Sequence, residues 1–173
     1  MINFELVQGD ITKVKVDAIV SAGNATLVTG GGTLDQAVHK AAGPELMDEC
    51  VRLRYERGGV FVGEAVIVDG FMLPAKKIIL TTGPMHIGGG YGEPERLAEC
   101  YRNCLLAASE AGFTSIAFPN ISCGSYAYPK KEAAEIALKT LKETADAATS
   151  IQKIIFVCLD PENYNIYKQL LGV

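Results

Sequence analysis

Six short apolar runs that barely alternate with polar residues constrain the fold of this chain more than any other feature. Runs such as AIV at Ala18–Val20 and IIFVCL at Ile154–Leu159 have the length of strands. Their lack of alternation indicates burial on both faces, which requires a layer of helices on each side of the sheet. The predicted strands are Phe4–Gln8, Ala18–Val20, Ala65–Val68, Lys77–Thr82, Ser115–Phe118 and Lys153–Leu159.

Helical segments between these runs predict where the covering layers come from. Gly43-Pro44 is typical of a helix stop followed by a proline at the next helix start, and Gly112 ends another helix. We therefore expect an α/β fold: a three-layer α/β/α sandwich with a central mixed sheet, whose last strands enter right-handed crossovers. The predicted helices are Leu34–Ala42, Glu45–Tyr55, Glu95–Ala111, Lys131–Ala147 and Glu162–Leu171.

The size and composition of the chain narrow its class. A length of 173 residues predicts a single domain over residues 1–173, and 49% hydrophobic with 21% charged residues is typical of a globular protein. No apolar run approaches the ~18 residues of a membrane span. The net charge of −4 argues against a broad nucleic-acid surface. We expect a monomer with no membrane partner.

The N-terminus and the cysteines predict the compartment. The opening MINFELVQGD has neither a basic region nor a long apolar stretch, so no signal peptide is expected. The cysteine count is five, an odd number, and no CxxC pair occurs, which favours reduced thiols in a cytoplasm. Two histidines and scattered cysteines show no ligand spacing, so no metal site is predicted.

Loops after strands are the place to look for a site, because α/β sheets bind ligands at the carboxyl ends of their strands. Two Gly-rich loops, 21–32 and 121–126, each follow a strand and precede a helix. Their free amides would lie beside the positive end of a helix dipole and suit a diphosphate. Neither loop contains GxxxxGK[ST] or GxGxxG. The alternative is that the glycines only make tight connections.

Three polar residues in or beside these loops have a structural and a functional interpretation. Asp10 would cap a short turn, or accept a hydrogen bond from an exocyclic amine such as that of adenine. Asn24 would hold a turn, or bind sugar hydroxyls. Asp35 would cap a helix, or act as an acid or base at the rim of a pocket.

Taken together, the loops resemble the macrodomain family. The resemblance is closest to the family's branch of ADP-ribosyl hydrolases and O-acetyl-ADP-ribose deacetylases, and it runs in order over nearly the whole chain. The matching motifs are GDIT at Gly9–Thr12, VDAIVSAGN at Val16–Asn24, GGG at Gly30–Gly32, HKAAGPEL at His39–Leu46, LPAKKII at Leu73–Ile79, TTGP at Thr81–Pro84 and SIAFPNISCGSYAYP at Ser115–Pro129.

The resemblance implies an ADP-ribose pocket that needs neither cofactor nor metal. It implies that Asp10 accepts the adenine amine with the Ile11 amide nearby, and that Asn24 binds the distal ribose. Asn24 and Asp35 are the implied catalytic residues, with Asp35 positioning or activating water.

Gly31 and Gly32 are implied to approach the ribose and phosphates. The implied second phosphate loop consists of Ser122, Cys123, Gly124, Ser125 and Tyr126, with Tyr126 also covering the distal ribose.

The chain departs from the family pattern in its first loop. It has SAGN at 21–24 where the family has NAAN, and GGGTLDQAVH where the family has GGGVDGAIH. Asp35 is therefore one residue late when counted from the glycines, but in place when counted back from His39. We favour the helical count, because a helix has fixed geometry and a Gly loop absorbs an insertion.

Three further departures lie elsewhere in the implied pocket. Cys123 stands where the family has Thr, and Ala127 where it has Gly. Leu159 stands where an aromatic residue often stacks on adenine, so aliphatic packing would hold the base.

The resemblance leaves several functions open. The leading hypothesis is a hydrolase that removes ADP-ribose from acidic side chains or deacetylates O-acetyl-ADP-ribose. The alternative is a non-catalytic reader module for ADP-ribose, and a third is a phosphatase for ADP-ribose 1″-phosphate. The expected partners are ADP-ribose, an ADP-ribosylated protein or O-acetyl-ADP-ribose.

Overall fold

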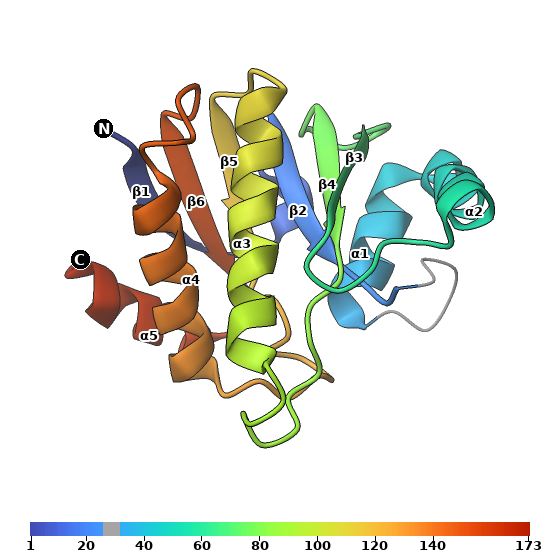
Figure 1. Cartoon of the computed structure of the whole chain (residues 1–173). Helices are drawn as coiled ribbons and strands as arrows, with labels where there is room; N and C mark the ends of the chain where they lie inside the picture. Colours follow the sequence, from blue (N-terminus) through green and yellow to red (C-terminus); the bar gives the residue numbers. More distant parts are fainter. Residues whose placement is uncertain (26–31) are drawn as a thin grey trace.

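A computed structural model of the chain describes residues 1–25 and 32–173 (Figure 1). Six strands form one sheet in the order β1-β6-β5-β2-β4-β3. The strands are β1 (Asn3–Gln8), β2 (Ala18–Ala22), β3 (Ala65–Asp69), β4 (Lys77–Thr81), β5 (Ser115–Phe118) and β6 (Lys153–Cys158). The helices are η1 (Ile11–Lys13), α1 (Thr33–Ala42), α2 (Pro44–Arg57), α3 (Glu93–Glu110), α4 (Lys130–Thr144) and α5 (Pro161–Leu171).

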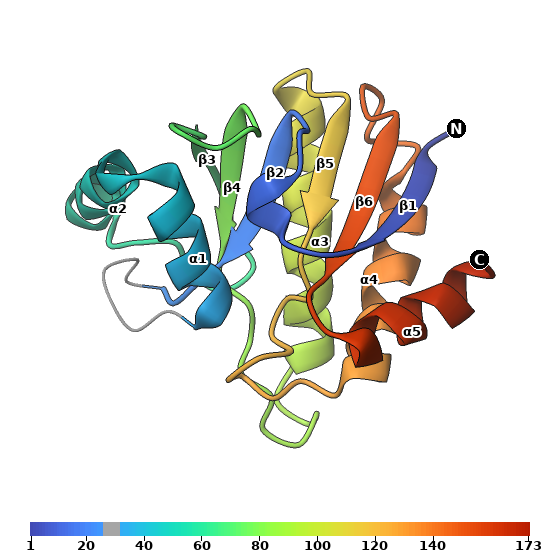
Figure 2. The same ribbon diagram turned by 180° about the vertical axis from the view of Figure 1, so that it is seen from behind.

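The predicted mixed sheet and its two helical layers are confirmed. β3 pairs with β4 in antiparallel register, and every other pair of neighbouring strands is parallel. The helices α3, α4 and α5 share a core with one face of the sheet, and α1 and α2 share a core with the other (Figures 1 and 2).

Strand β6 shows why its sequence does not alternate. Ile154 and Phe156 belong to the core under α3, α4 and α5, whereas Ile155 and Val157 belong to the core under α1 and α2. Successive side chains of a strand point to opposite faces, so a strand between two cores needs apolar residues at every position.

Several predicted boundaries differ from the observed ones, most of them by one or two residues. The helix expected to reach Ala147 ends at Thr144, where the Thr144 hydroxyl donates to the Thr140 carbonyl and the chain continues into turns. The last strand ends at Cys158 rather than Leu159, which is 68% exposed and enters the loop before α5. The short helix η1 is the turn that one interpretation of the sequence had Asp10 cap.

The loops that follow β1, β2, β4, β5 and β6 gather at one edge of the sheet, at the lower side of Figures 1 and 2. This edge is where the carboxyl ends of the parallel strands meet, as expected for a ligand site. Among the described residues, no helix is both long and apolar enough to cross a membrane. All five cysteines carry free thiols, and only Cys123 is not buried.

Candidate functional site

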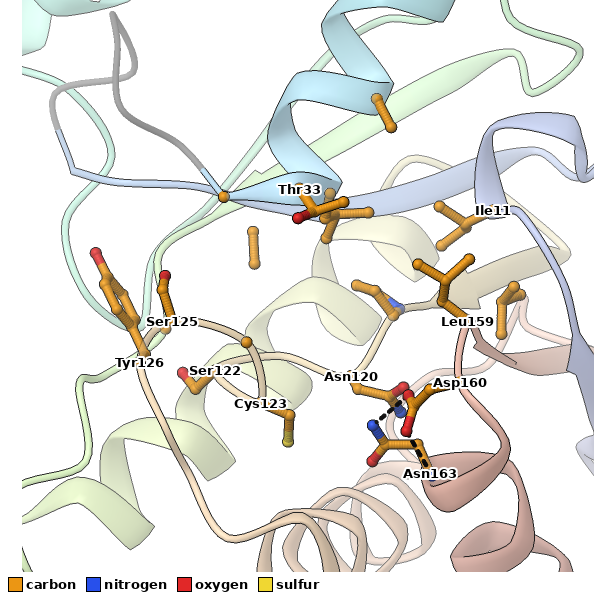
Figure 3. Close-up of a pocket in the computed structure, with 18 of the residues that line it drawn as sticks. Ile11, Thr33, Asn120, Ser122, Cys123, Ser125, Tyr126, Leu159, Asp160 and Asn163 are labelled. Carbon is orange, nitrogen blue, oxygen red and sulfur yellow. Dashed lines mark hydrogen bonds between the residues drawn. The ribbon is translucent and has the colours of Figure 1, made fainter.

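A cavity of about 410 Å³ opens at this edge between the loops and the first turns of α1 and α5 (Figure 3). Its volume is in the range of small-molecule sites. Tyr126 and Ser125 lie at one end of the cavity in Figure 3, and Ile11 and Leu159 lie at the other. The lining includes nine of the eleven residues expected from the sequence: Asp10, Ile11, Asn24, Gly32, Ser122, Cys123, Gly124, Ser125 and Tyr126.

The two remaining residues differ in their status. Gly31 lies outside the described residues. Asp35 is described, but it does not line the cavity, whereas its neighbours Thr33 and Leu34 do. The carboxylate of Asp35 lies instead next to Gly23 and to His39, with Oδ1 at 3.7 Å from His39 Nε2.

The environment of Asp35 favours its neutral form. Its side chain is 23% exposed, and burial raises the pKa of its carboxyl above the ordinary value, while His39 opposes that shift. A carboxyl whose pKa is raised by burial beside a cavity is a candidate for acid–base chemistry.

Asp10 has the capping role that the sequence allowed, and it also lines the cavity. It is the N-cap of η1, and its Oδ1 accepts hydrogen bonds from the Thr12 amide at 2.9 Å and the Thr12 hydroxyl at 2.7 Å. The bond from the Thr12 hydroxyl is the main cause that lowers the pKa of Asp10, so it stays ionised. Both of these bonds end on Oδ1, and Asp10 lines this end of the cavity.

The described part of the first Gly-rich loop faces the second one. Gly32 is the N-cap of α1, and its carbonyl accepts from the Gln36 amide at 3.1 Å. An ideal Cβ on Gly32 would lie 3.8 Å from Ser125 Oγ. The positive end of α1 therefore points into the same space as the second loop, an arrangement that favours an anionic group.

The second loop is a tight turn with open space above it. The Tyr128 amide donates to the Ser122 carbonyl at 2.9 Å, and Ala127 donates to Gly124 at 3.0 Å. Ser122 and Ala127 have φ values of 65° and 56°, in the left-handed region that costs a residue with a Cβ about 1–2 kcal/mol. An ideal Cβ on Gly124 meets no described heavy atom within 4 Å, so this glycine leaves room in the cavity itself.

The loop after β4 packs against the second Gly-rich loop, residues 121–126. An ideal Cβ on Gly83 would overlap Ser122 Oγ and would lie 2.7 Å from Ile121 Cγ2, so the two loops can pack only if residue 83 is glycine. The His86 amide donates to the Tyr126 carbonyl at 3.0 Å.

A buried carboxylate holds the loop after β4 in shape. Glu93 is 3% exposed and accepts hydrogen bonds from the amides of Ile87, Gly89 and Tyr91 at 2.6–2.8 Å. These amides lower the pKa of Glu93 to about 2, so it remains ionised. Because its charge is satisfied by the loop backbone, Glu93 acts as a fixed support rather than as a titrating group.

Cys123 does not supply a reactive thiolate. Burial raises the pKa of its thiol to about 12, so it is protonated at neutral pH. The thiolate is the nucleophilic form of cysteine, and Cys123 therefore contributes shape to the loop rather than covalent chemistry.

The sequence interpretation missed the polar residues at the first turn of α5. Asp160 caps this helix, accepting from the Asn163 amide at 3.1 Å and from Asn163 Nδ2 at 2.8 Å (Figure 3). Lys130 Nζ lies 3.2 Å from Asp160 Oδ2. The signal that could have found them is an Asp-Pro pair directly after a buried strand, which starts a helix at the carboxyl edge of the sheet.

Within residues 1–25 and 32–173, no three His, Cys, Asp or Glu side chains are grouped closely enough to hold a metal ion. The described lining of the cavity therefore supplies two carboxylates, from Asp10 and Asp160, and three amide side chains, from Asn24, Asn120 and Asn163. Hydroxyl groups and backbone amides of the loops complete it.

Comparison with known proteins gives consistent results. A sequence model described as "Macro domain" matches residues 20–137. The O-acetyl-ADP-ribose deacetylase of Salmonella typhimurium is 47% identical over 167 residues, which cover 96% of this chain and 93% of that protein.

Two solved structures share the fold over nearly the whole chain. The Oceanobacillus iheyensis macrodomain with ADP has a TM-score of 0.92 at 40% identity, covering 98% of this chain and 90% of that one. The Trypanosoma brucei macrodomain in complex with ADP-ribose has a TM-score of 0.88 at 33% identity, covering 98% and 69%.

Proposed function

The chain belongs to the macro domain family, and from this membership we propose that it is an ADP-ribose-binding ester hydrolase. Its substrates would be O-acetyl-ADP-ribose or ADP-ribose attached to acidic side chains. The deacetylase name of relatives that are 47% identical supports this activity. The observation that carries the proposal is the approach of Gly32 and Ser125, which lets two loops hold one diphosphate.

The ligand would lie along the cavity with its adenine beside Ile11 and Leu159 and its distal ribose beside Tyr126. Asp10 would accept the adenine amine through Oδ2, and the Ile11 amide would donate to the base. The diphosphate would accept hydrogen bonds from amides of the first turn of α1 and of Ser122, Cys123, Gly124 and Ser125, and Gly32 would pass close to it.

The reaction would take place at the distal ribose. A water adds to the acyl carbonyl, the bond between the acyl carbon and the ribose oxygen breaks, and the ribose oxygen takes up a proton. Asn24 would hold a ribose hydroxyl in position, and Asp35 would accept a hydrogen bond from the attacking water. Placing water and ester together supplies most of the rate enhancement in such a site.

A non-catalytic reader is the second candidate. The specific observation in its favour is that the Asp35 carboxylate lies against Gly23 and is not part of the cavity lining, whereas Gly23 is. A reader would bind ADP-ribose as tightly and would release no acetate.

We further propose that residues 1–173 form one domain that acts as a monomer. One sheet runs through the chain, and a single copy builds the cavity from five of its own loops. The free thiols favour a reducing compartment such as a cytoplasm.

Thermal unfolding with and without ligand tests the binding proposal, and product release tests the chemistry. ADP-ribose at 100 times its dissociation constant should stabilise the fold by about 2.7 kcal/mol, and ATP and NAD should stabilise it much less. Acetate release from O-acetyl-ADP-ribose supports the hydrolase. Stabilisation without turnover of that ester or of ADP-ribosylated Glu supports the reader, and no stabilisation at millimolar ADP-ribose contradicts both.

A further inference from the structure

Three exposed apolar side chains lie on the short loop after β4. Met85, Ile87 and Tyr91 are 56%, 61% and 78% exposed, and residues 83–92 include no Asp, Glu, Lys or Arg. Single exposed apolar residues are common on protein surfaces, whereas a group of them without charges is typical of a contact surface. Methionine and aromatic residues are also enriched at protein interfaces. We call these three side chains the apolar rim.

The backbone of the loop holds the apolar rim in place. The buried carboxylate of Glu93 accepts hydrogen bonds from the amides of Ile87 and Tyr91, so both residues are fixed to one group. An ideal Cβ on Gly88 or on Gly90 meets no described heavy atom within 4 Å. The loop therefore presents apolar side chains from a fixed main chain, and its glycines leave room for a polypeptide to approach.

The apolar rim lies beside the end of the cavity that contains Tyr126. His86 stands between Met85 and Ile87, and its amide donates to the Tyr126 carbonyl at 3.0 Å. The His86 ring also lies 4.8 Å from the ring of Tyr128. Tyr126 lines the cavity, whereas the residues of the rim do not. The rim is therefore outside the cavity, on a loop that lies next to the loop after β5 at the lower side of Figures 1 and 2.

In the proposed function, the ester bond lies at this same end. ADP-ribose would fill the cavity with its distal ribose beside Tyr126. When the acyl group belongs to a Glu or Asp of a protein, the rest of that protein must leave the cavity past this end. The acetyl group of O-acetyl-ADP-ribose has only a methyl group beyond its carbonyl, so nothing in it extends to the rim.

We propose that the apolar rim binds the residues that flank the ADP-ribosylated Glu or Asp of a protein substrate, with a preference for apolar flanking residues. This inference rests on the proposed function, and it names the protein-linked ester as the substrate that this surface serves. The reason for expecting an apolar segment, rather than an acidic or basic one, is the absence of charged residues from positions 83–92.

Two peptides test the preference without any substitution in the protein. Each carries ADP-ribose on a central Glu, and the neighbours of that Glu are Leu in one peptide and Ser in the other. The KM of the wild type should be about fivefold lower for the Leu peptide, since burial of apolar surface against the rim favours binding. The value of kcat should stay within about twofold, because these contacts are the same in the ground state and the transition state. Equal KM values would overturn the proposal.

Replacing the apolar rim with serine tests the residues themselves. Met85→Ser/Ile87→Ser/Tyr91→Ser changes exposed side chains and leaves the backbone amides that bind Glu93, so the variant should fold. Its KM for the Leu peptide should rise about tenfold, and its KM and kcat for O-acetyl-ADP-ribose should stay within about twofold. A wild-type KM for the Leu peptide would overturn the proposal. An equal rise for O-acetyl-ADP-ribose would also overturn it, because the change would then act on the cavity.

Val51→Ser/Tyr55→Ser/Met72→Ser is the matched control. These side chains are similar in type to those of the rim and are also exposed, and none of them lines the cavity. They belong to α2 and to the turn between β3 and β4, which lie away from the loop after β4 (Figures 1 and 2). The control should keep the wild-type KM for both peptides. A rise equal to that of the rim variant would overturn the proposal.

Binding and sedimentation distinguish failure of this inference from failure of the proposed function. If the wild type binds ADP-ribose but cleaves neither ester, the hydrolase proposal fails, and the dissociation constants of the two peptides then test the rim in the same way. If ADP-ribose does not bind, both proposals fail. A dimer of the wild type that the rim variant does not form would assign the rim to a second copy of this chain, and it would overturn the proposal.

Discussion

The two ends of the cavity differ in whether side chains or glycines define their shape. At the end near Ile11 and Leu159, side chains and their hydrogen bonds define the site, as when Thr12 orients the carboxylate of Asp10. At the end near Tyr126, missing side chains define it: a Cβ on Gly83 would overlap Ser122, and one on Gly23 would press on Asp35. In the proposed function, the first end would bind the ligand through side-chain groups, and the second end would provide the space that the ligand occupies.

This difference predicts how each end responds to substitution. In the proposed function, the end near Ile11 and Leu159 would hold the adenine, so removing a group there should delete one interaction and weaken binding by a graded amount. The end near Tyr126 would hold the diphosphate and ribose, so adding atoms there should fill space that the ligand needs and have an abrupt effect.

The largest effect is expected from Gly124→Val. Gly124 has an ordinary φ and open space around its Cα, so the valine side chain would project into the cavity without distorting the loop. Binding of ADP-ribose should weaken by more than about 100-fold, equivalent to roughly 2.7 kcal/mol, as measured by calorimetry. Gly90→Val is the matched control, since it adds the same side chain to open space away from the cavity.

Gly124→Val is informative only if the fold is intact, so both valine variants should keep native circular dichroism. A native Gly124→Val variant with wild-type affinity would show that this loop does not contact the diphosphate. It would also remove the contrast between the two ends.

A smaller effect, in the opposite direction, is expected from Leu159→Phe. Leu159 lines the end of the cavity where the adenine is proposed to bind and is 68% exposed, so a larger ring fits there without repacking the core. Stacking of an aromatic ring on adenine should tighten ADP-ribose binding by about 0.5–1.5 kcal/mol, or roughly 2- to 13-fold. Ribose 5-phosphate, which lacks the base, should bind as it does to the wild type. Equal tightening of both ligands would place the adenine elsewhere.

The architecture could be predicted from the sequence because it depends on patterns repeated along the chain. The unalternating run at Ile154–Leu159 requires two cores, and β6 contributes to both. The ends of elements were less predictable. α4 ends at Thr144, and the next amide, that of Ala145, donates to the Lys142 carbonyl in a tighter turn, a change that hydrophobic periodicity does not reveal.

The candidate site could be predicted as far as its loops, but not in the direction of every side chain. Nine expected residues line the cavity because the carboxyl ends of parallel strands must meet at one edge. The position of Asp35 depends on how α1 packs against the end of β2. The distance in space between these two segments cannot be derived from the sequence. Asp160 and Asn163 were missed because Asp and Asn occur both at helix caps and in ligand contacts. The residue type alone does not separate these two roles.

The central claim is that one end of the cavity binds the ligand and the other performs the chemistry. A paired measurement of Asp10→Ala and Asp35→Ala tests it most directly, with kcat for O-acetyl-ADP-ribose and the dissociation constant for ADP-ribose measured for each. Loss of one charged hydrogen bond is worth about 1.5–3 kcal/mol, or roughly 10- to 150-fold. In the proposed function, Asp10 would contact a part of the ligand that does not change in the reaction, whereas Asp35 would act only as charge develops.

Asp10→Ala should therefore raise the dissociation constant about 10- to 150-fold and leave kcat at saturation within about twofold. Asp35→Ala should lower kcat by at least about tenfold and leave the dissociation constant within about twofold. Wild-type kcat in Asp35→Ala, or losses of affinity and kcat that are equal in the two variants, would contradict the division of the cavity into a binding end and a reacting end.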